Sequence, residues 1–291
     1  MPQSSDPTRT VPTRRIAFDD ALRDVPKHFA GDGDLITSHL VAALSGLFPD
    51  GEDFFVRSVR HFRDQVTDPD LARQVSGFIG QESMHGREHR VFNDRLAELG
   101  YPTKFVERFT RRGLELRTRL VSPKANLAAT AAFEHVTATF AQLTLGNAEA
   151  RRMLGHPAVA ELFVWHALEE SEHKAVAFDV YRAVGGTERM RVLTMKFLRY
   201  GFIGGTAVQV VLSLLGDRAT FERGRLRASW ARFRRTPIMQ REVWLALCDY
   251  DRPDFHPDDH DVTDLVAQWR DRLFGAEGAL NARLVPSHSA A

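Results

Sequence analysis

The sequence predicts an all-α fold, a four-helix bundle with additional helices in its C-terminal third. Apolar residues recur at helical spacing along most of the 291-residue chain, and proline or glycine marks the breaks between these segments. The sequence contains no convincing β-strand pattern and no internal repeat. Acidic and imidazole side chains also recur at helical spacing inside apolar segments, which is typical of bundles built around buried polar groups.

Composition narrows the class of protein. The chain is 43% hydrophobic, enough to bury one large core or two smaller ones. Its formal net charge is +1, so no overall field points to nucleic acid, and we expect no nucleic-acid partner. The single Cys248 excludes a disulfide framework and fits a reducing compartment. Residues 1–14 are polar and lack the apolar core of a secretory signal, so we expect a disordered N-terminus and a cytoplasmic protein.

Turn and capping residues set the expected helix boundaries. Asp34 caps a short helix over 35–47, and the sequence FPDG at 48–51 predicts a break before a second helix that ends near Gln65. Asp68-Pro69 begins a helix that continues to Leu99. Further helices are expected over 103–120, 124–145, 157–183, 187–216 and 263–273. The expected regions are a bundle with flanking helices at 15–216, a basic helical extension at 217–274 and a disordered tail at 275–291.

The central motif consists of His166, Glu170 and His173, at positions i, i+4 and i+7 of the helix expected over 157–183. A helix places all three side chains on one face, and an imidazole, a carboxylate and an imidazole on one stripe form one side of a metal site. Glu169 lies four residues before His173 and is the alternative to Glu170 as a ligand.

Three other helices provide matching groups. Glu82 and His85 form a Glu-x-x-His pair, and Glu52 and Glu134 are single acids on two further helices. Two such pairs with two single glutamates, one contribution per helix, form the ligand pattern of dinuclear carboxylate bundles. Glu52 also has a simpler explanation, because an acid in the first turn of a helix favours the helix N-terminus without any ligand.

His89 lies on the same helix face as Glu82 and His85, seven and four residues after them. We expect it either behind the metal ligands, where it would orient a ligand or shuttle a proton, or as an ordinary hydrogen-bonded polar residue.

Metal is the partner that best accounts for these acids. Glu82, Glu134 and Glu170 lie among apolar neighbours on helices that must pack together. An unpaired ionised carboxylate in a core costs several kcal/mol, whereas a whole domain is stable by only about 5–15 kcal/mol. The candidate helix faces carry no matching lysine or arginine. Four carboxylates with neutral imidazoles balance two divalent cations, and this donor set suits iron or manganese, with zinc as an alternative.

Two segments after the motif helix predict contacts at the surface. Residues 200–216 are uncharged, so they form a buried or interface helix, a helix at a membrane surface, or a membrane span. Residues 217–241 contain eight arginines with Trp230 and Phe233 among them, which indicates either a solvated face or contact with anionic lipid or an acidic partner. Contact of residues 200–235 with a membrane surface and formation of a homodimer are both left open.

The chain from about Arg14 to Trp269 resembles a bacterial group of ferritin-like proteins named predicted metal-dependent hydrolases. The resemblance rests on the segments 48–55 (FPDGEDFF), 81–85 (QESMH), 133–135 (FEH), 165–174 (WHALEESEHK) and 255–257 (FHP). It implies a ferritin-like bundle with a metal site.

The resemblance also implies roles for the ligands. In the bundle family, Glu82 and Glu134 would bridge two ions, while Glu52 and Glu170 would be terminal ligands. The His-x-x-x-Glu-x-x-His spacing of the central motif is similar to that of the di-iron arylamine N-oxygenases, which implies that His166 joins the last histidine of the motif on one ion.

We expect a di-iron enzyme that activates O2 to oxidise a small organic substrate, with an electron donor as a further partner, because the ligands are those of O2-activating bundles. The apolar helix faces would form the substrate pocket. A two-metal hydrolase of an ester, amide or phosphoester is the alternative, and a non-catalytic metal-binding protein is the third possibility.

Overall fold

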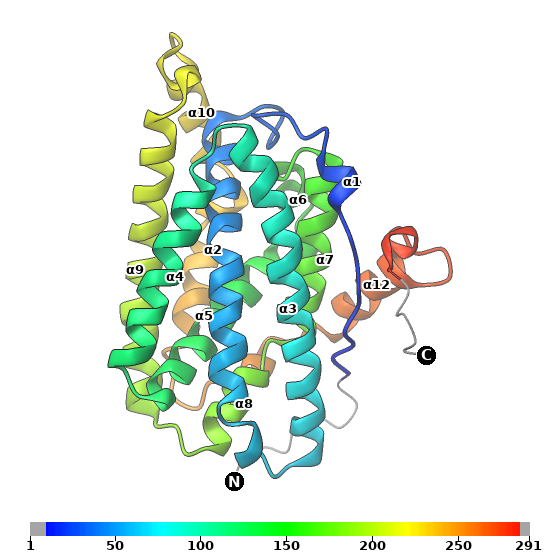
Figure 1. Cartoon of the computed structure of the whole chain (residues 1–291), viewed down its shortest axis with the longest axis vertical. Coiled ribbons are helices and arrows are strands. Elements are labelled where there is room, and N and C mark those ends of the chain that lie inside the picture. Colours follow the sequence, from blue (N-terminus) through cyan, green and yellow to red (C-terminus); the bar gives the residue numbers. More distant parts are fainter. Residues whose placement is uncertain (1–9, 286–291) are drawn as a thin grey trace.

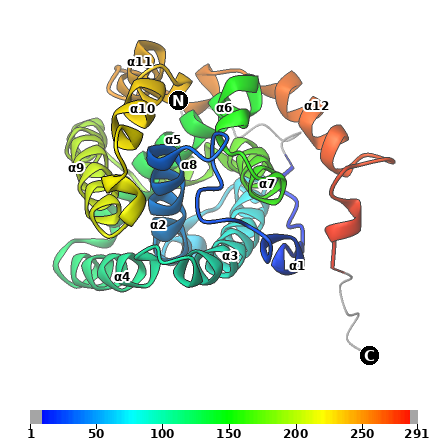
Figure 2. The same ribbon diagram turned by 90° about the horizontal axis from the view of Figure 1, so that it is seen from above.

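A computed structural model describes residues 10–285 and confirms the all-α fold (Figure 1). Its centre is formed by α2 (Leu35–Arg60), α3 (Pro69–Glu98), α5 (Pro123–Gly146) and α7 (Pro157–His173), the last continued by α8 (Val176–Ala183). Figure 2 shows these helices grouped around a common centre when viewed from above. In the described residues, the only strand-like pairing is an isolated antiparallel bridge between Ile16 and Leu284.

Helix α2 is continuous, so the predicted break at 48–51 is wrong. Pro49 lies inside it and lacks the N–H that would bond to the carbonyl of Ser45. The side-chain amide of Asn93, on α3, donates to that carbonyl at 3.0 Å and satisfies the freed acceptor. Glu52 therefore lies in the middle of a helix, which removes the simpler explanation of this acid as a first-turn residue.

Most other predicted boundaries agree with the structure. The Asp68 side chain caps α3, and the Ser122 side chain caps α5. The helices α4 (Thr103–Leu120), α9 (Glu188–Leu215) and α12 (Thr263–Phe274) lie close to their predicted ranges. The helix expected over 157–183 is interrupted after His173, where the buried Lys174 donates to the backbone carbonyl of Pro257 at 3.0 Å.

Additional helices surround the central four. Helix α4 packs on α2 from outside and connects α3 to α5, while α9 packs on α5 and α2 (Figures 1 and 2). The short helices are α1 (Asp19–Leu22), α6 (Ala148–Met153), α10 (Arg225–Phe233) and α11 (Arg241–Asp249). The outer helices α4 and α9 therefore lie on the side of the bundle that carries α2.

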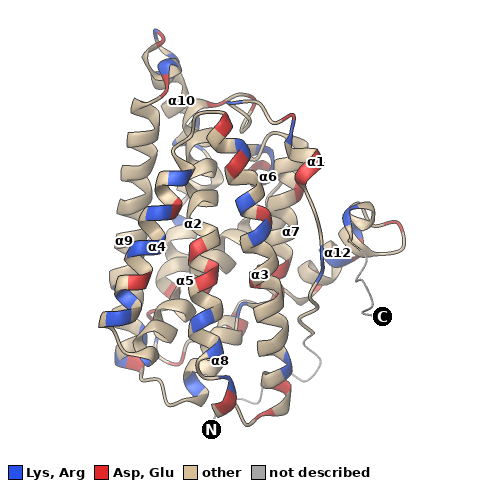
Figure 3. Ribbon diagram, in the orientation of Figure 1, with Lys and Arg blue, Asp and Glu red and all other residues tan. Residues whose placement is uncertain are grey.

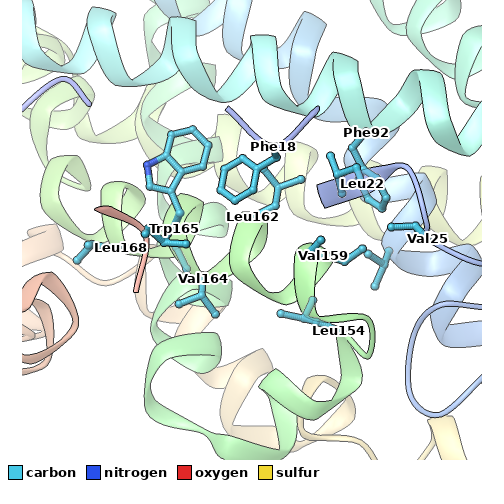
Figure 4. Packing of buried hydrophobic residues seen from close by; sticks show 14 of the residues in the cluster. Phe18, Leu22, Val25, Phe92, Leu154, Val159, Leu162, Val164, Trp165 and Leu168 are labelled. Carbon is cyan, nitrogen blue, oxygen red and sulfur yellow. The ribbon is translucent and has the colours of Figure 1, made fainter. Parts of the chain in front are cut away.

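The segment before α2 packs against the bundle. Phe18 and Leu22 lie on Leu162 and Trp165 of α7, and the rings of Phe18 and Trp165 are 5.7 Å apart (Figure 4). Burying each of these side chains stabilises the fold by about 1.5–3 kcal/mol.

Both chain ends that were expected to be disordered contain residues with defined contacts. The backbone N–H of Val285 donates to the carbonyl of Arg15 at 2.9 Å, and that of Ala17 donates to Arg283 at 3.2 Å. The two end segments also contact the bundle, because Gln81 of α3 donates to the carbonyl of Pro12 at 3.0 Å and Arg283 donates to Glu161 of α7 at 2.8 Å. Residues 1–9 and 286–291 are outside the described residues.

Candidate metal centre

The bundle brings all seven predicted ligand residues together in its interior, each at most 4% exposed. They form two groups, and within each group one donor atom per residue lies within 4.8 Å of the others. The first group is Glu52, His85 and His166, and the second is Glu82, Glu134, Glu170 and His173. Helices α2, α3, α5 and α7 each contribute, as the ligand pattern predicted.

Two members of the second group, Glu82 and Glu170, also lie close to histidines of the first group. Oε1 of Glu170 is 3.0 Å from Nε2 of His166 and 3.6 Å from Nε2 of His173. Oε1 of Glu82 is 3.0 Å from Nε2 of His173 and 4.0 Å from Nδ1 of His85. These two carboxylates are placed to contact an ion in either group.

Glu52 and Glu134 lie at opposite ends of the centre. Glu52 is 3.7 Å from Nε2 of His166, and Glu134 is 3.4 Å from Nε2 of His173. This placement differs from the roles that the resemblance implied, because Glu134 is at an end and Glu170 lies between the groups. It also places His166 and His173 in different groups of donor atoms, whereas the resemblance implied that they share an ion.

Each histidine of the centre uses its two ring nitrogens differently. One nitrogen faces the carboxylates, and the other is hydrogen-bonded to a further side chain, an arrangement typical of metal-binding imidazoles. The hydrogen bonds join His85 Nε2 to Glu169 at 3.0 Å, His173 Nδ1 to Gln81 at 2.8 Å and His166 Nδ1 to His89 at 2.7 Å. These bonds fix the ring orientations and leave His85 Nδ1, His173 Nε2 and His166 Nε2 facing the centre.

Many of the polar atoms that face the centre have no hydrogen-bond partner in the described part of the chain. They include both carboxylate oxygens of Glu52, Glu82 and Glu134, Nδ1 of His85 and Nε2 of His173. A buried polar atom without a partner costs about 1–3 kcal/mol, and a bound cation would remove that cost for the whole set. Oxygen and imidazole donors in two close groups, with four carboxylates in all, fit two divalent ions.

Burial and mutual repulsion dominate the electrostatics of the protein without metal. Burial, together with the charges of neighbouring glutamates, raises the pKa values of Glu52 and Glu134 well above their usual range and also raises the pKa of Glu82. Burial opposes the charge on Glu170 as well, but nearby imidazoles, chiefly that of His173, hold its pKa well below the usual range. Protons on the three raised carboxylates would have to leave when metal binds.

Glu169 faces away from the centre, so Glu170 is the residue of this pair that the helix directs inward. Glu169 contacts the outer nitrogen of His85 and lies 2.9 Å from Nη1 of Arg14. Burial raises the pKa of Glu169 to about 8, although Arg14 acts in the opposite direction. Arg14 also donates two hydrogen bonds of 2.8 Å to Glu172. Sequence reasoning does not find Arg14, because it lies 155 residues from Glu169 in a segment expected to be disordered.

His89 is fully buried and contacts a ligand histidine instead of the centre itself. Its Nδ1 is 2.9 Å from the Ser45 hydroxyl, which donates to Oδ1 of Asn93 at 2.7 Å. Burial lowers the pKa of His89 well below its usual range, so the ring is neutral. A neutral His89 that donates from Nδ1 to Ser45 accepts, at Nε2, a hydrogen bond from the N–H at Nδ1 of His166. The lone pair on Nε2 of His166, which faces Glu170, is then available to a metal ion.

A cavity of about 220 Å³ adjoins the centre. Its lining is mainly aliphatic and aromatic, and Glu52, His166 and Glu170 are its only ionisable residues among those described. Phe48 lies beside the centre, with its ring 4.9 Å from that of His166. No lysine or arginine of the described chain lines this cavity, so it suits an uncharged apolar molecule.

A third group of possible donors, His28, His39 and Asp217, is held by its own hydrogen bonds. Asp217 Oδ2 accepts from Nε2 of both histidines, at 2.9 and 3.1 Å. The outer nitrogens of the histidines are also occupied, by Arg225 and Ser213. These contacts explain the group as a structural link, in which His28 before α2 and His39 within α2 are joined to the end of α9.

Comparison with known proteins gives one match. No curated protein and no solved structure matches the chain. The profile of a family described as "Predicted metal-dependent hydrolase" matches residues 12–261, which include all seven residues of the candidate centre. The chain belongs to this family of predicted metal-dependent hydrolases.

Proposed function

We propose that this protein is a di-iron enzyme that activates O2 and oxidises a small apolar organic molecule. The observation that carries the proposal is the contact between a carboxylate-rich centre and an apolar cavity. Three of the seven candidate ligands, Glu52, His166 and Glu170, form part of the cavity wall. A molecule in the cavity would therefore lie directly beside the ions.

In the proposed site, Glu52, His85 and His166 would hold one ion, and Glu82, Glu134, Glu170 and His173 would hold the other. Bound iron would supply the redox chemistry with O2, for which an oxygen- and nitrogen-donor site is suited. His89 keeps its ligand histidine in one tautomer, and the paired Glu169 and Arg14 hold His85 from the other side.

The cavity walls would exclude water from the reacting molecule. Phe48 and Phe163 both line the cavity, and their ring centroids are 6.3 Å apart. An apolar wall binds hydrocarbon or aromatic groups through burial alone, which contributes about 25 cal/mol per Å² of apolar surface. Oxidation is the reaction class that does not require further polar groups on such a substrate.

Hydrolysis by two metal ions is the second candidate, and the family's description favours it. The same residues would hold ions that polarise an ester or amide carbonyl. A phosphoester fits less well, because the cavity lining in the described chain has no cationic side chain for phosphate.

Oxygen consumption by the loaded protein distinguishes these functions. The protein is loaded anaerobically with Fe(II) and mixed with O2 while absorbance and dissolved O2 are followed. We expect O2 uptake and a change in absorbance, with both lost in Glu170→Ala. Glu161→Ala is the matched control, because Glu161 is on the same helix but half-exposed and paired with Arg283. Hydrolysis would be favoured if the iron-loaded protein did not react with O2 and the zinc-loaded protein turned over apolar esters in the absence of O2.

A further inference from the structure

Helix α9 carries a long exposed apolar stripe. It is the one helix of the described chain that is long and apolar enough to cross a membrane, yet only 22% of its most apolar window is buried. The side chains of Leu193, Phe197, Tyr200, Val208, Val211 and Leu215 follow helical spacing along one face and are all more than half exposed. Phe197 is 86% exposed, which is unusual for a large aromatic residue.

Helix α4 continues this apolar surface. Phe105, Phe109, Leu116 and Leu120 share a face at spacings of four and seven residues, and each is more than half exposed. We call the exposed apolar residues of α4 and α9 the outer apolar face. Exposed apolar residues gathered in this way on neighbouring helices mark a contact with another molecule or with lipid.

Positive charge is concentrated beside the outer apolar face. Residues 103–120 contain six basic residues and two acids, and 217–241 contain eight arginines and two acids, although the whole chain has a net charge of only +1. In Figure 3 the ribbon of α4 carries several blue positions, whereas the upper half of α9 is tan. Arg218, Arg223, Arg227, Arg234 and Arg235 have no ion pair among the described residues. The charge of this side of the protein complements an anionic surface.

A groove of about 540 Å³ lies between α4 and α9. It adjoins the cavity of about 220 Å³ beside the metal centre, called the inner cavity below. Leu114 and Arg117 line one side, and Phe197, Gly201 and Gly205 line the other. Five residues line both the groove and the inner cavity: Leu47, Phe54, Leu114, Phe133 and Phe202. The groove and the cavity are therefore separated by side chains only.

Glycines keep the groove open. Gly201, Gly204 and Gly205 lie inside α9, where each costs up to about 1 kcal/mol of helix stability relative to alanine. A Cβ added at any of them would meet no other atom within 4 Å, so close packing against another helix does not explain them.

We propose that the outer apolar face docks on an anionic lipid bilayer, so that the groove between α4 and α9 opens towards the acyl chains. The apolar side chains would enter the bilayer surface, and the arginines of α4 and α10 would contact anionic headgroups. A second copy of the chain is the less suitable partner, because a two-fold interface would bring two equally basic surfaces together.

A full membrane span by α9 is disfavoured by the contacts of its N-terminal half. Arg191 and Arg199 are buried on the inner side of the helix. Arg199 donates to the carbonyl of Leu247 at 3.0 Å and to Asp251 at 2.8 Å. These bonds hold α9 against α11, so it would lie along the bilayer surface.

This docking also identifies a source of substrate, a step that rests on the proposed function. An apolar molecule dissolved in the bilayer would pass through the groove to the inner cavity and the metal centre. The substrate class would then be uncharged lipids or lipid-soluble aromatic molecules.

Vesicle co-sedimentation tests the docking directly. The full chain is mixed with phosphatidylcholine vesicles with or without phosphatidylglycerol, at low and high salt. We expect binding to the anionic vesicles at low salt, with at least tenfold weaker binding at high salt because exposed charges are screened. Phe197→Glu should reduce binding at least tenfold, whereas Val285→Glu, a similar change outside the face, should not.

A reporter tryptophan tests the orientation of the groove. A Cβ added at Gly205 would meet no atom within 4 Å, so a side chain can start there. We expect the fluorescence of Gly205→Trp to be quenched by phosphatidylglycerol brominated in the acyl chains. Gly146→Trp, at the end of α5, has similar room and should be quenched much less.

Three results would overturn the docking proposal. The first is that the protein does not sediment with anionic vesicles, and the second is that Phe197→Glu binds the vesicles as well as the wild type does. The third is that the wild type forms a stable dimer, which Phe197→Glu dissociates, and does not bind vesicles. Metal content, measured on the same samples, separates this inference from the proposed function. If the protein holds metal but does not bind vesicles, the docking proposal is refuted and the proposed function is not.

Discussion

Replacement of Glu134 by leucine should have opposite effects on the metal-free and the metal-loaded protein. Glu134 is fully buried, and neither carboxylate oxygen has a hydrogen-bond partner in the described chain. Removing a buried unsatisfied polar group relieves about 1–3 kcal/mol, so metal-free Glu134→Leu should unfold at a higher temperature than the metal-free wild type. Each kcal/mol corresponds to about 2–4 °C in Tm. With metal, the variant should lose an ion and become less stable than the wild type.

Calorimetry with chelator and with zinc, a redox-silent probe, measures both effects. Glu169→Leu is the control, because Glu169 is equally buried but is paired with Arg14 and His85. Breaking a buried pair costs about 3–5 kcal/mol, so this control should be destabilised with or without metal. If metal-free Glu134→Leu fell in Tm as Glu169→Leu does, Glu134 would be a structural residue and the assignment of the centre would be wrong.

Three further predictions concern the surroundings of the centre. Burial raises the pKa values of three carboxylates of the centre, so the metal-free protein loses stability as the pH rises above the usual carboxylate range, and metal binding releases protons. The difference in Tm between the loaded and the metal-free protein should therefore widen as the pH rises above that range, and a constant difference would contradict this. His89→Phe removes the acceptor for His166 and should weaken metal binding about 10–100-fold in a competition assay with a chelator, whereas His89→Gln should recover part of the loss. Arg14→Leu removes the cation paired with the buried Glu169, whereas Glu172 keeps its pair with Arg270. The variant should lower the free energy of unfolding by about 3–5 kcal/mol in urea titrations, and a neutral effect would contradict the pairing.

The ligand helices were predictable because their signals are local. Proline and an acidic cap mark the start of α3, and Glu-x-x-His spacing identifies the inward face of a helix without knowledge of its neighbours. The choice of Glu170 over Glu169 followed from spacing to two histidines, and the geometry places Glu170 inward.

The features that sequence could not provide depend on contacts between distant segments. Pro49 breaks an isolated helix, and only the amide of Asn93 on another helix compensates for its missing hydrogen bond. Arg14 supports the centre from a segment with no periodic pattern of its own. The positions of Glu134 and Glu170 relative to the two groups depend on how four helices are rotated about their axes, which residue spacing within one helix does not determine.

Metal stoichiometry tests the central claim most directly. The protein is purified from iron-supplemented cells, reconstituted anaerobically with Fe(II), freed of loosely bound metal and analysed by plasma mass spectrometry. The two groups of donors predict about two ions per chain in the wild type and in Glu161→Ala, and a large loss in Glu170→Ala, whose carboxylate lies between the groups. A wild-type protein that retains only traces of metal, or that binds as much metal without Glu170 as with it, would contradict the assignment of this centre.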